Sequence, residues 1–263
     1  MQQRHPIAKR ALGQNFLTDE TVVSRILSAF DAKPEDVVVE IGPGRGALTE
    51  RLVGQAKHVY ALEFDRDLAP LLAHRFGHLD NFTLVEGDAL KLDFAGIDRE
   101  DRKLRLIANL PYNISTAILQ RLFEYAGVFE DCVLMFQREV AHRVMALPGT
   151  KDRGYLSVMT ELYFSAEPLF DVPPGAFRPV PKVWSSVIRL TSLQRPHAPS
   201  QVFERLIAAG FAQKRKTIAN NLKLQFPDYL TALSTAGIDP QRRAESLTLD
   251  EWLRLSGAVA SEE

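Results

Sequence analysis

The residues best suited to chemistry are Asn109, Leu110, Pro111 and Tyr112, which follow the apolar run 104–108. That run is typical of a buried strand, and open α/β sheets bind their ligands at the carboxyl ends of such strands. Asn109 offers a side-chain carbonyl, the proline leaves the preceding backbone carbonyl outside the sheet ladder, and Tyr112 offers an aromatic face. The tetrapeptide therefore predicts a site that holds an exocyclic amino group and stacks on the ring that carries it.

A second candidate site lies upstream, where a glycine-rich turn over 42–46 follows the β-branched run 37–41. Such a turn lets the backbone approach a ligand closely, but it is ambiguous, because it also satisfies a loose dinucleotide fingerprint or serves only as a tight connection. Glu63 and Asp88 end two successive strand-like runs. Either acid alone could be a solvated strand end. Together they favour a nucleoside without phosphates, one acid for the ribose hydroxyls and one for the adenine amino group.

The surrounding sequence alternates between strand-like and helical patterns, which predicts βαβ units and a doubly wound sheet. A proline-rich loop over 172–181 interrupts the alternation between two strand-like runs, Leu162–Phe164 and Val183–Leu190. We predict from this an antiparallel hairpin at the sheet edge. The predicted parallel strands are 37–41, 58–62, 82–85, 104–109 and 132–136.

The domain organisation follows from a change in composition after residue 191. Residues 192–200 contain two prolines and few apolar side chains, which predicts a linker. Beyond it the apolar residues recur only at helical spacing. We therefore predict a catalytic domain over 1–191 and a helical domain over 201–263.

Composition limits the kind of protein and its location. The chain of 263 residues is 46% hydrophobic and 25% charged, and it has a net charge of −1. No apolar stretch approaches the roughly 20 residues of a membrane span, and no secretory signal is evident. Cys132 is the single cysteine, so we expect a reducing, cytoplasmic location and no intrachain disulfide. Any nucleic-acid binding must come from local basic clusters.

Taken in chain order, these motifs resemble those of the ribosomal RNA adenine dimethyltransferases, over nearly the whole chain. The strongest resemblance is to the bacterial enzymes that dimethylate two adjacent adenosines near the 3′ end of small-subunit (16S) rRNA. The large-subunit enzymes show Ile where Leu110 stands, and DNA adenine methyltransferases carry two prolines in the motif. The matching motifs are Gly13–Leu17, Glu40–Gly46, Glu63, Asp88, Asn109–Asn113, Phe136–Val140, Ala176–Pro179, Gln213–Thr217 and Gly237–Pro240.

The resemblance implies an α/β fold: a Rossmann-like, seven-stranded S-adenosylmethionine-dependent methyltransferase domain followed by a small all-helical domain. It also implies S-adenosylmethionine as methyl donor, and we expect no metal. The residues that it places at the cofactor are Asn15, Leu17, Gly42, Gly44, Glu63, Asp88, Ala89 and Asn109.

For the methyl transfer itself, we expect the Asn109 side chain and a carbonyl at Leu110 or Pro111 to hold the adenine amino group, with no catalytic base. Tyr112 would stack on one face of the adenine and Phe177 on the other. A core aromatic is the alternative reading for Tyr112, and an apolar plug beneath the loop is the alternative for Phe177.

The expected partner is small-subunit rRNA within a ribosomal precursor particle, bound by a monomer away from any membrane. Basic runs are often only a solvated face, and we assign no role to Arg45 or Trp184. The alternatives are methylation of 23S rRNA, a non-catalytic RNA-binding assembly or transcription factor on the same fold, and an NAD-dependent oxidoreductase. The candidate phosphate contacts are Arg10, Lys214, Arg215, Lys216, Arg242 and Arg243.

Overall fold

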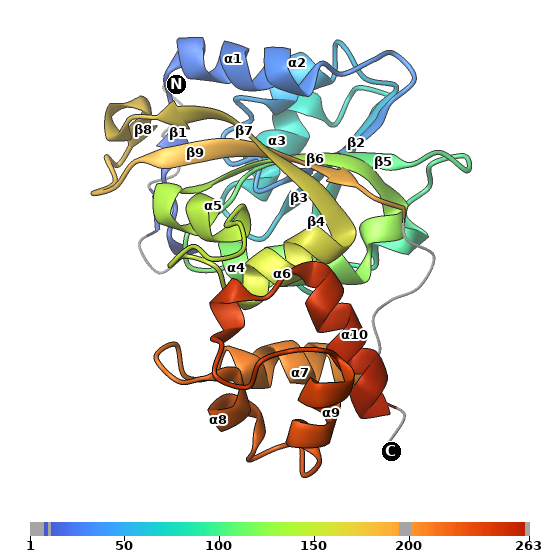
Figure 1. Cartoon of the computed structure of the whole chain (residues 1–263). Coiled ribbons are helices and arrows are strands. Elements are labelled where there is room, and N and C mark those ends of the chain that lie inside the picture. The colour runs from blue at the N-terminus through green and yellow to red at the C-terminus, as the bar shows by residue number, and fades with distance from the viewer. Residues whose placement is uncertain (1–7, 10–11, 195–200, 261–263) are drawn as a thin grey trace. The chain divides into compact units, whose positions relative to one another are not determined.

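A seven-stranded sheet forms the centre of the N-terminal part of the chain in the computed structural model, which describes residues 8–9, 12–194 and 201–260 (Figure 1). The strand order is β4-β3-β2-β5-β6-β9-β7. Strands β2 to β6 run parallel, and β9 is antiparallel to β6. The strands are β2 (Val37–Ile41), β3 (His58–Glu63), β4 (Phe82–Glu86), β5 (Leu104–Asn109), β6 (Phe129–Gln137), β7 (Phe164–Val172) and β9 (Ser185–Ser192).

This arrangement confirms the predicted doubly wound sheet with a reversed strand beyond its parallel part. Every residue of β2 is buried, as expected for a central parallel strand that is covered on both faces. Two short strands, β1 (Phe16–Leu17) and β8 (Phe177–Arg178), form a separate antiparallel pair. That pair joins the N-terminal segment to the proline-rich loop.

The helices of this part pack on both faces of the sheet, with α1 and α2 on one face and α4 on the other (Figure 1). Asp19 caps α1 by accepting hydrogen bonds from the backbone N–H groups of Thr21 and Val22. The buried face of α1 and the sheet together form the core. The helices are α1 (Glu20–Phe30), α2 (Thr49–Leu52), α3 (Ala69–Phe76), α4 (Ser115–Glu124) and α5 (Arg138–Val144).

One predicted strand is wrong. Leu162 and Tyr163 end the helix α6 (Tyr155–Tyr163), and β7 begins only at Phe164. Both residues are buried and continue, with Met159, a three-to-four-residue spacing on one helix face. A short apolar run fits a helix end and a strand equally well, so the pattern alone did not separate them.

The chain divides into two compact units. Each unit is built from two separate segments, whereas the sequence predicted one boundary between two continuous domains. One unit comprises Met1–Ala141 and Ser165–Ser192, and the other comprises His142–Phe164 and Leu193–Glu263. The buried Arg153 explains why the segment 142–164 groups with the C-terminal helices, because its guanidinium donates to the carbonyl oxygen of Leu247 at 3.2 Å. Of the predicted linker 192–200, residues 195–200 lie outside the described part of the chain.

The second unit is otherwise helical, as predicted. A capping box begins its last helix: the backbone N–H of Thr248 donates to Glu251 Oε2 at 2.8 Å, and the N–H of Glu251 donates to Thr248 Oγ1 at 3.2 Å. Among the described residues, no helix combines the length and apolar character of a membrane span. The remaining helices are α7 (Gln201–Gly210), α8 (Ile218–Leu222), α9 (Tyr229–Thr235) and α10 (Leu249–Ala260).

Candidate functional site

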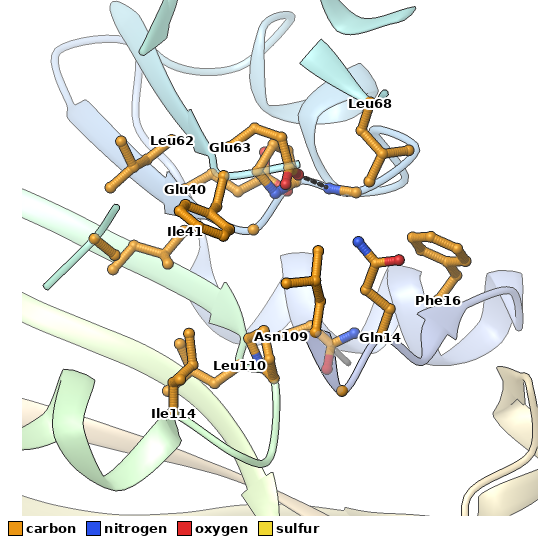
Figure 2. Close-up of a pocket in the computed structure, with 18 of the residues that line it drawn as sticks. Gln14, Phe16, Glu40, Ile41, Leu62, Glu63, Leu68, Asn109, Leu110 and Ile114 are labelled. Atoms are coloured by element: carbon orange, nitrogen blue, oxygen red, sulfur yellow. Dashed lines mark hydrogen bonds between the residues drawn. The ribbon is translucent and has the colours of Figure 1, made fainter. Parts of the chain in front are cut away.

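A cavity lies at the carboxyl ends of β2, β3 and β5, and Figure 2 shows some of the residues that line it. It brings together every residue predicted to bind the cofactor and four of the five predicted to act on the amine. The exception is Phe177. Most lining residues belong to the segments 12–17, 40–45, 62–64, 87–90 and 109–114, and Ala47, Leu48 and Leu68 complete the lining.

The glycine-rich turn forms one wall because its backbone is left-handed where a side chain would be strained. Gly42 has φ = 67° and Gly44 has φ = 60°. This conformation directs the Gly44 N–H toward β3, where it donates to Glu63 Oε2 at 3.1 Å. The turn and the strand-end acid therefore form one unit.

Glu63 is 6% exposed and ends β3, with both carboxylate oxygens engaged by backbone donors. Its Oε1 accepts from the Asp65 N–H at 2.8 Å. Burial raises the pKa of Glu63 above its usual value, and the N–H groups of Asp65 and Gly44 act in the opposite direction. A ribose could add hydroxyl donors to this carboxylate and further stabilise its charged form.

The next acid, Asp88, lies two residues beyond the end of β4 and lines the same cavity. Its Oδ1 accepts from the backbone N–H of Leu90 at 3.0 Å, which fixes the loop. Sequence reasoning missed two apolar neighbours here, Phe64 and Leu90. Phe64 is 61% exposed, so it can form an apolar wall for a flat base; its place directly after Glu63 was the available signal.

Glu40 was also missed as a site residue. It is 2% exposed, lines the cavity and accepts a hydrogen bond from Thr49 Oγ1 at 2.6 Å. Burial raises its pKa to about 7, the Thr49 hydroxyl opposes the shift, and the nearby Glu63 charge adds to it. The signal in the sequence was an acid inside the apolar run 37–41, where a charge is costly.

The four residues predicted to hold the amine lie at and just after the end of β5 and line the cavity. Asn109 donates from Nδ2 to the Asn15 carbonyl oxygen at 3.2 Å. The Pro111 carbonyl closes a turn by accepting from the Ile114 N–H at 3.1 Å, which favours Leu110 over Pro111 as the backbone acceptor for a substrate. Tyr112 is half-buried, and its hydroxyl lies 2.8 Å from Ser185 Oγ.

Tyr112 thus combines the two readings that the sequence left open. Burial raises the pKa of its phenol, while the Ser185 hydrogen bond acts to lower it. The ring is anchored through its hydroxyl, as a structural aromatic would be, yet it lines the cavity. An anchored ring is a suitable stacking surface because it loses little entropy when a base binds.

Phe177 is not brought to the cavity, which corrects the predicted second stacking surface for this structure. Its side chain is fully buried in the hydrophobic core, and its residue pairs with Leu17 across the β1–β8 ladder. This placement matches the alternative reading of an apolar plug beneath the proline-rich loop. Stacking on an adenine would require the ring to leave the core.

The candidate phosphate contacts of the second unit differ among themselves. The segment 214–216 is exposed in the loop between α7 and α8. The buried Asn221 holds this loop by donating from Nδ2 to the Gly210 carbonyl at 2.5 Å and to the Gln213 carbonyl at 3.2 Å. The loop therefore presents its cations on a fixed backbone.

Arg242 is instead part of an internal ion pair. Its Nη1 and Nη2 lie 2.5 and 3.0 Å from the two carboxylate oxygens of Glu251, so we withdraw it as a phosphate contact. Arg243 remains half-exposed, 3.8 Å from Glu245. Arg10 lies outside the described residues.

The two residues without an assigned role occupy defined positions. Arg45 lies against the cavity, with its guanidinium carbon 4.5 Å from the centroid of the Phe16 ring. Trp184 is 43% exposed, beside the guanidinium of Arg138. Among the described residues, no group of three His, Cys, Asp or Glu side chains is placed to hold a metal ion.

The cavity fits a nucleoside joined to an amino-acid tail. A buried carboxylate, an apolar wall and a second acid suit the ribose and the base. The glycine turn offers a partly exposed backbone to the tail, and it packs closely on the N-terminal segment, since a Cβ at Gly44 would lie 3.2 Å from Phe16 Cδ1.

Comparisons with known proteins agree with this geometry. The family described as "Ribosomal RNA adenine dimethylase" matches residues 7–261. The chain is 44% identical over 257 residues to "Ribosomal RNA small subunit methyltransferase A" of Pseudomonas savastanoi pv. phaseolicola, covering 96% of this chain and 95% of that protein. It is 44% identical over 258 residues to the protein of the same description from Pseudomonas aeruginosa, with the same coverage.

Two solved structures are similar over nearly their whole length. A dimethyladenosine transferase from Plasmodium falciparum has a TM-score of 0.78 and 26% identity, covering 91% of this chain and 95% of that one. The 23S rRNA methyltransferase ErmE has a TM-score of 0.67 and 28% identity, covering 94% of this chain and 100% of that one.

Proposed function

Because the chain belongs to the ribosomal RNA adenine dimethylase family, we propose that it transfers methyl groups from S-adenosylmethionine to N6 of adenosines in small-subunit rRNA. The descriptions of its relatives at 44% identity support the small subunit as the source of the RNA. Its motifs support the finer assignment to two adjacent adenosines near the 3′ end of 16S rRNA. The RNA would lie within a cytoplasmic precursor particle, where the modification contributes to small-subunit biogenesis.

The observation that carries the proposal is the shared cavity. Asn109 and Tyr112 lie in the same hollow as Glu63 and Asp88, although the sequence separates them by more than 20 residues. A site for an exocyclic amine therefore adjoins a site for a nucleoside cofactor. That juxtaposition is what direct methyl transfer requires, since donor and acceptor atoms must meet in one geometry.

The cofactor supplies an electrophilic methyl group, and the residues of this chain must supply the geometry of the amine. We assign the two hydrogen bonds from the adenine N6 to the Asn109 side-chain oxygen and the Leu110 carbonyl. These bonds draw the nitrogen lone pair out of conjugation and point it at the methyl group. The proton can leave after transfer, so no side chain is assigned as base.

The target adenine has to leave its stack to reach this cavity. Tyr112 provides one stacking face, worth roughly 1–3 kcal/mol for a base on an aromatic ring. The exposed loop 214–216 provides positive charge for the phosphates of a folded RNA, which is read mainly by shape. The small amide of Asn109 leaves room for a monomethylated amine, as a second transfer demands.

The proposal is tested by comparing Asn109→Ala with the unchanged protein on small-subunit particles that lack the modification. Removal of one preorganised hydrogen bond should lower the single-turnover rate about 10²- to 10³-fold, with RNA affinity retained. Gln55→Ala, which removes an exposed amide far from the cavity, should leave the rate unchanged. A wild-type rate in Asn109→Ala contradicts the assigned role, and no methylation of the small-subunit particles by the unchanged protein contradicts the substrate.

A further inference from the structure

Asp65 is a buried acid to which the proposed function gives no part. It lies two residues beyond Glu63 and is 3% exposed. Its Oδ1 lies 2.5 Å from Lys9 Nζ, and its Oδ2 accepts from Gln14 Nε2 at 2.7 Å. Burial alone would raise the pKa of Asp65, but the hydrogen bonds from Lys9, the Asp67 N–H and Gln14 lower it below its usual value. Asp65 is therefore a charged anchor for the N-terminal segment.

Gln14 links Asp65 to the backbone of the N-terminal segment. Its side-chain oxygen accepts from the Lys9 N–H at 2.7 Å, while its side-chain nitrogen donates to Asp65. Both ends of the amide are used, so its orientation is fixed, and with it the position of the next residue, Asn15. We refer to residues 12–17 as the strap.

The strap reaches the catalytic amide through the backbone of Asn15. The Asn15 carbonyl oxygen lies 3.2 Å from Asn109 Nδ2. A carbonyl can only accept, so this contact requires the NH₂ half of the Asn109 amide to face the strap. The oxygen half then points the other way, and an oxygen is what the amino group of the substrate needs as its acceptor.

The far end of the strap is held independently. The Phe16 ring packs against Gly44 and lies under the Arg45 guanidinium at 4.5 Å. Leu17 pairs with Phe177 in the β1–β8 ladder. Phe177 and Arg45 therefore hold the C-terminal end of the strap. Asp65 holds its N-terminal end.

We infer that Asp65 is a positioning residue for methyl transfer, acting through Gln14 and the Asn15 carbonyl to keep the acceptor oxygen of Asn109 toward the substrate. This inference rests on the proposed function. The same residue also donates its backbone N–H to Glu63 Oε1 at 2.8 Å. One residue thus joins the cofactor end of the cavity to its amine end.

The first test is Asp65→Asn, which preserves volume but removes the charge that holds Lys9 and Gln14. At saturating S-adenosylmethionine and RNA, we expect kcat to fall about 10- to 100-fold through loss of orientation, with the Kd for RNA unchanged. Asp67→Asn is the matched control, because Asp67 also lies 2.6 Å from Lys9 Nζ but has a 63% exposed side chain. It should change kcat less than about twofold.

A double-mutant cycle separates positioning from general damage. In an Asn109→Ala background there is no amide left to orient, so Asp65→Asn should cause little further loss of single-turnover rate. Equal losses in both backgrounds would overturn the inference, as would an unchanged kcat in Asp65→Asn.

Two further measurements keep the outcome clear. Gln14→Met interrupts the same link without altering Asp65, and it should reproduce the loss of kcat if Asp65→Asn fails to fold; a wild-type kcat would overturn the link. Methylation by the unchanged protein is measured first. Its absence contradicts the proposed function, whereas its presence together with an additive cycle contradicts only the role of Asp65.

Discussion

Charged residues are arranged differently at the two ends of the parallel strands. We call the end at which these strands begin the amino edge of the sheet, and the end at which they finish the carboxyl edge. At the amino edge, Arg105 lies between two acids, with Nε and Nη2 at 2.7 and 2.9 Å from the Asp131 oxygens and Nη1 at 2.7 Å from Asp36. Its Nη2 also donates to the Phe30 carbonyl at 2.6 Å. Each of these three charges meets an opposite charge within the protein.

At the carboxyl edge, the two buried acids of the cavity, Glu40 and Glu63, meet neutral donors instead. Glu40 accepts from the Thr49 hydroxyl, and Glu63 accepts from backbone N–H groups. Burial consequently raises the pKa of both carboxyls. The comparison shows that the two edges have different roles. Paired charges at the amino edge stabilise the fold. The buried acids at the carboxyl edge are available to bind a ligand, and their burial costs some stability.

The largest expected effect is on stability at the amino edge. Arg105→Met leaves Asp36 without its guanidinium partner and leaves Asp131 only Arg189, whose Nε lies 3.5 Å away. Breaking a buried ion pair in this way costs about 3–5 kcal/mol. Urea unfolding should show this loss. The affinity of the remaining folded protein for S-adenosylmethionine should be unchanged. A large loss of that affinity would contradict the claim that the amino edge serves stability and not binding.

A smaller effect, on binding rather than stability, is expected at the carboxyl edge. Glu63→Gln should weaken binding of S-adenosylmethionine by about 1.5–3 kcal/mol, the value of hydrogen bonds to a charged group. Glu86→Gln is a matched control, because Glu86 pairs with Glu63 across β3 and β4 but is exposed outside the cavity. Titration calorimetry that finds equal losses in both variants would contradict the assignment.

A third expected effect is the pH dependence of stability that Glu40 causes. The pKa of Glu40 is raised from 4.5 in the unfolded chain to about 7 in the fold, so between these values the folded state retains a proton that the unfolded state has lost. The free energy of unfolding therefore falls as pH rises through this window, by at most about 1.4 kcal/mol per pH unit.

Glu40→Gln should remove this contribution and raise stability relative to the unchanged protein at pH 8. Denaturant titrations of both proteins at several pH values test it, since their difference isolates Glu40 from Glu63. A constant difference across the window would mean that Glu40 does not titrate there.

The sequence alone predicted features that are local in the chain. The β-branched run 37–41 predicted a buried strand, because that pattern depends only on neighbouring residues. The site residues were also found this way, since Glu63 and Asn109 directly end strands and parallel strands bring their carboxyl ends to one edge. Their meeting in one cavity then followed from topology.

Features that depend on distant side chains could not be predicted. Gln14 meets Asp65 across 51 positions, and Arg153 joins the C-terminal helices through the carbonyl of Leu247, 94 positions away. No spacing rule signals such contacts. The burial of Phe177 and the pairing of Arg242 with Glu251 likewise depend on the packed fold, which selects one of two chemically reasonable roles.

The central claim is that the carboxyl-edge cavity dimethylates adenosine N6 in small-subunit rRNA. The most direct measurement is nucleoside mass spectrometry of that RNA from cells lacking this protein. The account predicts that N6,N6-dimethyladenosine is absent from it and returns when the unchanged protein is restored. Intact N6,N6-dimethyladenosine in the small-subunit rRNA of cells lacking the protein would contradict the account.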